Sequence, residues 1–173
     1  MERTWTRVLV WVAMAGLVAI DGLYLAIIHF QGDPAPADVL TVPFVASYLA
    51  AMTILLGASM SSSARAKPVL RAAASAGLLV LAALAAFSIG ALILVIAGLA
   101  IAATIPALGS QKSTRVRVAA GVAALAAAVV LVGGLELTSR YLACPPTGSS
   151  GGTTGSFFGQ VSYECDSGRL TTR

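Results

Sequence analysis

The chain has 173 residues, of which 58% are hydrophobic and 10% are charged. A soluble domain usually has about 45–50% apolar and about 25% charged residues, so this composition argues against the soluble enzyme classes and favours a protein embedded in lipid. The 11 basic and 7 acidic residues give a net charge of +4. In a membrane chain such an excess fixes the orientation of the loops, so we expect the lipid bilayer, and no nucleic acid, as a partner.

A spanning helix needs about 20 mostly apolar residues, so the chain has room for four to six spans and for no separate soluble enzyme domain. We predict five spans, at residues 8–29, 39–60, 70–87, 90–108 and 116–137. The first span follows Arg3 and Arg7 and so resembles a secretory signal, but its apolar run continues past Asp21 to Phe30. We therefore expect an uncleaved first helix with a cytoplasmic N-terminus.

The connection after the first span contains Pro34 and Pro36, which prevent a helix from running through it. Asp38 is placed to cap the second span, and Pro43 lies in or near its first turn, where a missing N–H group costs least.

Two basic segments enclose the long apolar stretch at residues 69–108. As one helix this stretch would measure about 60 Å, roughly twice the hydrocarbon core. Basic segments collect on the cytoplasmic side, so an even number of crossings must lie between these two. We predict a reversal at residues 87–90, with a re-entrant hairpin or a turn a few residues away as alternatives. The cations of the two segments are Arg65, Lys67 and Arg71 at the start of the stretch, and Lys112, Arg115 and Arg117 after it.

The fifth span leads to a polar tail at residues 138–173, which we expect on the extracytoplasmic side. The predicted fold class is an all-α integral membrane protein: a five-helix transmembrane bundle over residues 1–137, followed by a disulfide-closed tail with a short β-hairpin-like segment. The chain contains no asparagine and only two lysines, which is typical of a GC-rich genome. We therefore expect a multi-pass protein of a bacterial plasma membrane.

Both cysteines, Cys144 and Cys165, lie in this tail. We predict a disulfide between them, formed in an oxidising compartment. The bond would close a loop of about 20 residues and contribute on the order of 3 kcal/mol in the chain-entropy model. Because the two cysteines do not form a Cys-x-x-Cys motif, a redox-active pair has little support.

The end of the tail has the pattern of a hairpin. Residues 160–165 alternate in character, and Asp166, Ser167 and Gly168 form a turn signal before residues 169–172. Residues 147–156 are rich in Gly, Ser and Thr, and we predict a flexible loop there. The aromatic residues of the tail either pack on the outer ends of the helices or dock onto a partner; these are Phe157, Phe158 and Tyr163.

Asp21 is an ionisable residue well inside a predicted span. A carboxylate at such a depth costs roughly 2.5–3.5 kcal/mol on insertion scales and usually faces a bundle interior or water. It is either a proton or cation site, or a polar anchor to another subunit, or a structural acid hydrogen-bonded to a nearby hydroxyl or helix end.

Glu136 lies near the outer end of the fifth span, and Arg140 follows four residues later, in the favourable order for a helical ion pair. The alternative is that Asp21 and Glu136, at similar depth, line one outward-facing polar cavity and share a cation or proton. His29 is the only histidine and has no cysteine near it, so we expect an interfacial residue rather than a metal ligand.

The sequence contains no Gly-rich phosphate loop, no Gly-x-Ser-x-Gly elbow and no His-Glu-x-x-His motif, so we nominate no catalytic, cofactor-binding or metal-binding residue. Small residues crowd the last three spans, among them Ala82, Gly90 and Ala120, which favours close helix packing. The leading hypothesis is an accessory or interaction subunit of a membrane complex, or a self-associating bundle. The alternatives are a small transporter or channel that uses Asp21, and a membrane enzyme acting on lipid or quinone.

Overall fold

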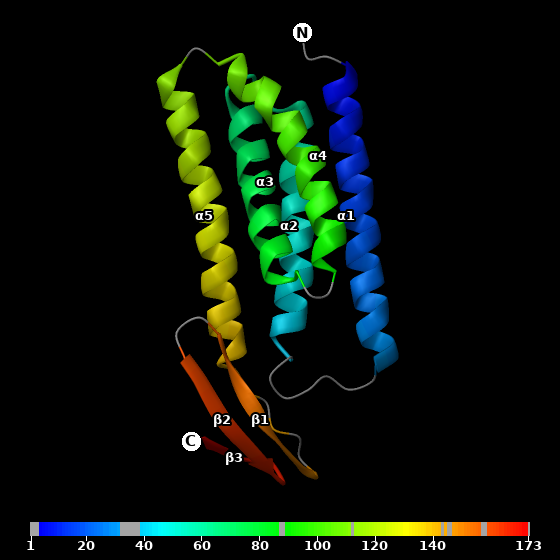
Figure 1. The fold of residues 1–173 in the computed structure, drawn as a ribbon, viewed down its shortest axis with the longest axis vertical. Coiled ribbons are helices and arrows are strands. Elements are labelled where there is room, and N and C mark those ends of the chain that lie inside the picture. The colour runs from blue at the N-terminus through cyan, green and yellow to red at the C-terminus, as the bar shows by residue number, and fades with distance from the viewer. Residues whose placement is uncertain are drawn as a thin grey trace. The chain divides into compact units, whose positions relative to one another are not determined.

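The structure is a computed structural model that describes residues 4–31, 39–86, 89–111, 113–142, 144, 147–156 and 159–172. In these residues five α-helices precede a three-stranded sheet (Figure 1). All five helices are long and apolar enough to cross a membrane, which confirms the predicted number. The elements are α1 (Thr4–Gln31), α2 (Thr41–Ser61), α3 (Ala66–Leu84), α4 (Gly90–Gly109), α5 (Thr114–Ser139), β1 (Ser149–Ser156), β2 (Gly159–Asp166) and β3 (Arg169–Thr172).

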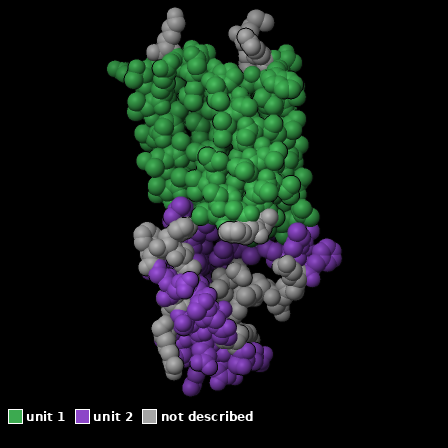
Figure 2. All heavy atoms as spheres, in the orientation of Figure 1, with its two compact units in different colours: residues 1–24, 48–131 green, residues 25–47, 132–173 purple. Residues whose placement is uncertain are grey.

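The chain forms two compact units, coloured separately in Figure 2. Unit 1 comprises Met1–Tyr24 and Tyr48–Leu131, and unit 2 comprises Leu25–Ser47 and Val132–Arg173. The boundaries between the two units therefore fall within α1, α2 and α5. The expected separation into a bundle domain and a tail domain at residue 137 stays a prediction. Pro43 lies in the first turn of α2, as expected, whereas its predicted cap Asp38 lies outside the described residues.

Within unit 1, α3 and α4 form a helical hairpin (Figure 1), and most of the buried residues of these two helices are small. Ala74 and Leu78 of α3 are fully buried, as are Ala97 and Ala100 of α4. Small side chains let two helix backbones approach closely, which is the usual basis of helix packing in membranes. The apolar stretch at residues 69–108 is therefore two packed helices, as the charge pattern predicted.

Gly90 makes the reversal between α3 and α4 tight. Its N–H group donates a hydrogen bond of 2.9 Å to Ala85 O. A Cβ atom at Gly90 would collide with the carbonyl oxygens of Ala82 and Ala85, so only glycine fits there. The predicted turn residues Phe87 and Ser88 lie outside the described residues.

A polar contact across unit 1 joins α2 to α5. Tyr48 Oη donates a hydrogen bond of 2.8 Å to Ala127 O. The tyrosine passes over Gly77 of α3, where a Cβ atom would collide with Tyr48 Oη and lie 2.9 Å from Met52 Sδ. The hydrogen bond between α2 and α5 therefore depends on the absence of a side chain at residue 77.

In unit 2 the strands form an antiparallel sheet in the order β1-β2-β3. The predicted hairpin is present, with Asp166 paired to Arg169. Ser167 and Gly168 have φ values of 48° and 83°, and two successive left-handed residues are what a tight turn with the twist of the strands requires.

The expectation of a flexible loop at residues 147–156 is wrong, because Ser149–Ser156 form β1 and pair with β2 along its whole length. The glycines that suggested a loop make room for a cross-strand aromatic side chain. A Cβ atom at Gly152 would lie 3.3 Å from Oη of Tyr163, its partner on β2. Pairing with an aromatic-bearing strand has thus overridden the local preference of a Gly-, Ser- and Thr-rich segment.

Two contacts attach this sheet to the segment that follows α5. The predicted disulfide between Cys144 and Cys165 is present, with a Cα–Cα distance of 5.5 Å and with Cys165 fully buried. In addition, Thr154 Oγ1 donates a hydrogen bond of 2.6 Å to Ser139 O at the end of α5. A covalent link and a polar link therefore both hold the sheet.

Gly77→Ala should destabilise the protein, because the added methyl group displaces Tyr48 and breaks its bond to Ala127. Overpacking of this kind costs about 1–3 kcal/mol, and we expect the thermal unfolding midpoint in detergent to fall by a few degrees. Gly98→Ala in α4 is the matched control, because a Cβ atom there meets no atom within 4 Å. Equal midpoints for the two variants would contradict this account of α2–α3–α5 packing.

Candidate functional site

A pocket of about 650 Å³ lies at one end of unit 1, where α1 and α3 begin and α4 ends. Its volume is within the range of small-molecule sites. The wall carries two cations, and the described residues that line it include no carboxylate. The polar residues of the wall are Thr6, Lys67, Arg71, Ser110 and Gln111.

Arg71 is the largest fully buried side chain in the described residues, with 1% of its surface exposed. Its Nε donates a hydrogen bond of 3.1 Å to Ser59 Oγ in α2, and its Nη1 donates one of 3.3 Å to Ala103 O in α4. The Ser59 hydroxyl in turn donates to Leu56 O at 2.6 Å. Arg71 therefore connects α3 to both of these helices and is held in one orientation.

A second polar contact between α3 and α4 lies one helical turn beyond Arg71. Ser75 Oγ is 3.1 Å from Thr104 Oγ1, and both residues are buried. Because the Thr104 hydroxyl donates its single proton to Ala100 O at 2.7 Å, the Ser75 hydroxyl must donate to Thr104. The interior of this apolar hairpin thus contains an ordered polar row.

Arg71 is one of the cations used to assign a basic loop, but it also falls within the predicted span at residues 70–87. It lies inside α3 and is buried, because Ser59 and Ala103 supply acceptors for its guanidinium. Lys67, Arg71 and Ser75 are spaced four residues apart and so share one face of the helix. That polar stripe in an apolar helix is the sequence signal that could have revealed the pocket.

Asp21 lies in α1, within unit 1, and is partly buried. Its Oδ1 atom is buried and has no hydrogen-bond partner among the residues that the structure describes. A buried carboxylate oxygen without a donor is costly in lipid. The carboxylate of Asp21 is therefore a candidate for binding a proton or a cation.

Glu136 lies in unit 2, where its Oε1 accepts a hydrogen bond from Arg140 Nε at 2.8 Å and forms a salt bridge with Arg140 Nη2 at 2.6 Å. The spacing of four residues is the one expected for a helical ion pair. Glu136 Oε2 is buried and has no hydrogen-bond partner among the described residues. Because Asp21 belongs to unit 1 and Glu136 to unit 2, their shared cavity stays a prediction.

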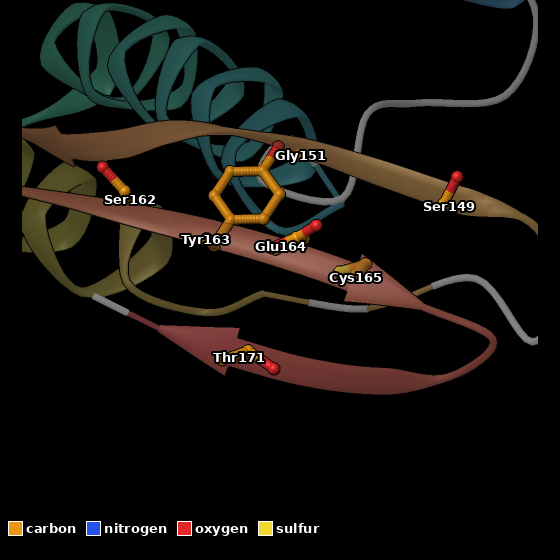
Figure 3. A pocket seen from close by; sticks show the side chains of 7 residues that line it. All are labelled: Ser149, Gly151, Ser162, Tyr163, Glu164, Cys165 and Thr171. Atoms are coloured by element: carbon orange, nitrogen blue, oxygen red, sulfur yellow. The ribbon is translucent and has the colours of Figure 1, made fainter.

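The sheet of unit 2 carries a smaller pocket of about 370 Å³. Figure 3 shows the Tyr163 ring rising from β2 towards β1, on which Gly152 is its paired residue. The other lining side chains supply hydroxyl groups and the carboxylate of Glu164, while the sulfur of Cys165 is held in the disulfide. The described residues that line this pocket include no cation and no imidazole, and its titratable side chains are Tyr163 and Glu164.

His29 lies in the last turn of α1, with its ring 6.1 Å from that of Phe30, and both residues are exposed. Neither residue lines the two pockets described above. Comparisons of the chain with protein-family models, with curated proteins and with solved structures find no match.

Proposed function

We propose that this chain is a multi-pass protein of a bacterial plasma membrane and acts as an accessory or interaction subunit. It packs within a larger membrane complex or with copies of itself, and it performs no chemistry of its own. The observation that supports this proposal is an exposed face of small and β-branched residues on α5.

α5 contributes little to the protein interior. In its most apolar segment 17% of the residues are buried, compared with 50% in α3. On the exposed side Ala119 and Ala126 are seven residues apart, and so are Val122 and Val129. A seven-residue repeat brings such residues onto one seam, the geometry by which a helix meets a partner in a left-handed pair.

Small residues on this seam favour a protein partner over lipid. Lipid chains accept large apolar side chains as readily as small ones, so contact with lipid alone gives no reason for alanine at both positions. Contact with a second helix does give a reason, because alanine allows the backbone of that helix to approach closely. The seam on α5, formed by Ala119, Val122, Ala126 and Val129, is therefore the proposed interaction surface.

The proposed orientation places the start of α1 and the α2–α3 and α4–α5 connections in the cytoplasm. Cations cluster at these positions, as the positive-inside rule requires. The strands of the tail would then lie outside after five crossings, where an oxidising compartment maintains the disulfide. The described cations at the cytoplasmic positions are Arg7, Arg65, Lys67, Arg115 and Arg117.

Cysteine labelling in intact cells tests this orientation. Ser62→Cys and Ser113→Cys should react only with a membrane-permeant maleimide, whereas Thr172→Cys should also react with an impermeant one. Ser88→Cys, outside the described residues, should behave like Thr172→Cys. The described native cysteines are joined in the disulfide and therefore do not react with the maleimides. Impermeant labelling at residue 62 or 113 would contradict the orientation.

Ala126→Leu tests the interaction seam. Purification from native membranes in mild detergent should yield a stoichiometric companion or an oligomer of the wild-type chain. The larger side chain at residue 126 should separate the helices and weaken this association on the order of tenfold, because overpacking an interface costs about 1–3 kcal/mol.

Ala51→Leu is the matched control, because Ala51 is also exposed but lies on α2. It adds the same bulk to the chain and should leave the association unchanged. A monodisperse monomer for the wild-type chain, or equal behaviour of the two variants, would contradict the proposed interaction surface.

A small transporter or channel is the second candidate, because Asp21 Oδ1 is buried without a described hydrogen-bond partner. An intramembrane carboxylate in this condition is the usual form of a proton or cation site. In its charged form Asp21 would bind a proton or a cation, and protonation of the carboxylate would release a bound cation.

Flux measurements in proteoliposomes separate the two candidates. If the chain transports protons or monovalent cations, Asp21→Asn should abolish the flux, because it keeps the shape of the side chain and removes its charge. Glu164→Gln, an exposed acid on β2, is the control and should leave the flux intact. Absence of flux from the wild-type chain under an imposed potential would exclude the transport hypothesis.

A further inference from the structure

We propose that the pocket of about 650 Å³ at the basic end of unit 1 binds the phosphate group of an anionic phospholipid. The proposal goes beyond the accessory function but rests on the membrane insertion on which that function depends. The pocket combines a buried arginine, a second cation, apolar walls and an exposed tryptophan.

The charge of the pocket favours an anion. Lys67 and Arg71 both line it, and the described lining residues include no carboxylate. Phosphate oxygens are strong acceptors, and charge-assisted hydrogen bonds from Lys and Arg to phosphate are stronger than neutral ones. Basic pockets between membrane helices on the cytoplasmic side are typical sites for anionic headgroups.

Arg71 is pre-organised for such a ligand. Its hydrogen bonds to Ser59 Oγ and Ala103 O hold the guanidinium plane in place, and 1% of the residue is exposed. A planar guanidinium that is already fixed loses little conformational entropy when it binds an oxyanion. The rim is fixed as well, because Gln111 Nε2 donates a hydrogen bond of 3.0 Å to Ala64 O.

The walls beside the cations favour a lipid over soluble phosphate. Pro68, Pro106 and Ala107 give the pocket an apolar side, and Trp5 at its edge is 69% exposed. Tryptophan at a helix end is the usual anchor at the level of the headgroups. A phospholipid matches both halves of this surface, with its phosphate on the cations and its glycerol and upper acyl chains on the apolar wall.

Trp5 fluorescence provides a direct readout, because the chain has two tryptophans and Trp11→Phe leaves Trp5 as the only emitter. The variant is reconstituted in phosphatidylcholine bilayers with increasing fractions of phosphatidylglycerol that carries brominated acyl chains. We expect phosphatidylglycerol to quench Trp5 more strongly than brominated phosphatidylcholine does at the same mole fraction.

Lys67→Gln should lower this preference for phosphatidylglycerol roughly fivefold, because one cation next to an anionic lipid contributes about 1 kcal/mol of attraction. Arg65→Gln is the matched control, because it removes the same charge two residues before Lys67, at a residue that does not line the pocket. It should change the preference by less than about twofold, since an exposed charge is screened by salt. Ala107→Phe should abolish the preference by filling the pocket, without any change of charge.

The outcomes separate the possible ligands. Equal losses in Lys67→Gln and Arg65→Gln would overturn the pocket and leave diffuse surface attraction. Relief of quenching by millimolar inorganic phosphate would overturn the lipid assignment in favour of a soluble phosphate. Quenching by phosphatidylcholine without any preference for phosphatidylglycerol would overturn the headgroup site alone. Absence of all quenching would overturn both the membrane insertion and the lipid site.

Discussion

The buried guanidinium of Arg71 decides how three helices of unit 1 meet. A charge removed from water loses several kcal/mol of solvation, so the N–H groups of the guanidinium have to meet acceptors. α2 supplies the Ser59 hydroxyl and α4 supplies the Ala103 carbonyl oxygen. These two bonds fix the position of α3 between its neighbours and also place a cation on the wall of a pocket.

The short reach of these polar contacts explains the composition of the hairpin. The contact between Ser75 and Thr104 spans 3.1 Å, so α3 and α4 must approach closely along their length. Fully buried alanines at positions 74, 97 and 100 allow that approach. Among the five helices burial is greatest in α3 and least in α5, so α5 keeps most of its apolar surface exposed. That surface is available to lipid and to a partner.

Unit 2 shows how a segment without an apolar core is stabilised. β1 consists of Gly, Ser and Thr, and a sheet of this size is marginal by itself in water. Backbone pairing with β2, the Cys144–Cys165 disulfide and the bond from Thr154 to Ser139 supply what a core would otherwise provide. The tail can therefore keep a defined shape with few buried side chains.

Features that depend on residues close together in the sequence could be predicted without a structure. Hydropathy and the two basic segments predicted five helices and a reversal within residues 69–108, and the turn signal at Ser167 and Gly168 predicted the hairpin. Asp21 was identified in the same way, because a carboxylate within an apolar run is unusual wherever it points. The predictions of the helices, the reversal and the hairpin are confirmed because each rests on local composition, spacing or backbone conformation, whereas the role of Asp21 stays a prediction.

Three features depend on contacts with other segments of the chain and so were decided by the tertiary structure. Arg71 looks like a loop cation until Ser59 and Ala103, 12 and 32 residues away, provide its acceptors. β1 looks like a flexible loop until β2 offers its backbone and Tyr163. The lack of a described partner at Asp21 Oδ1 is a property of the surrounding packing. A single segment does not encode the groups that will surround it, so burial and hydrogen bonding of polar residues emerge only from the assembled fold.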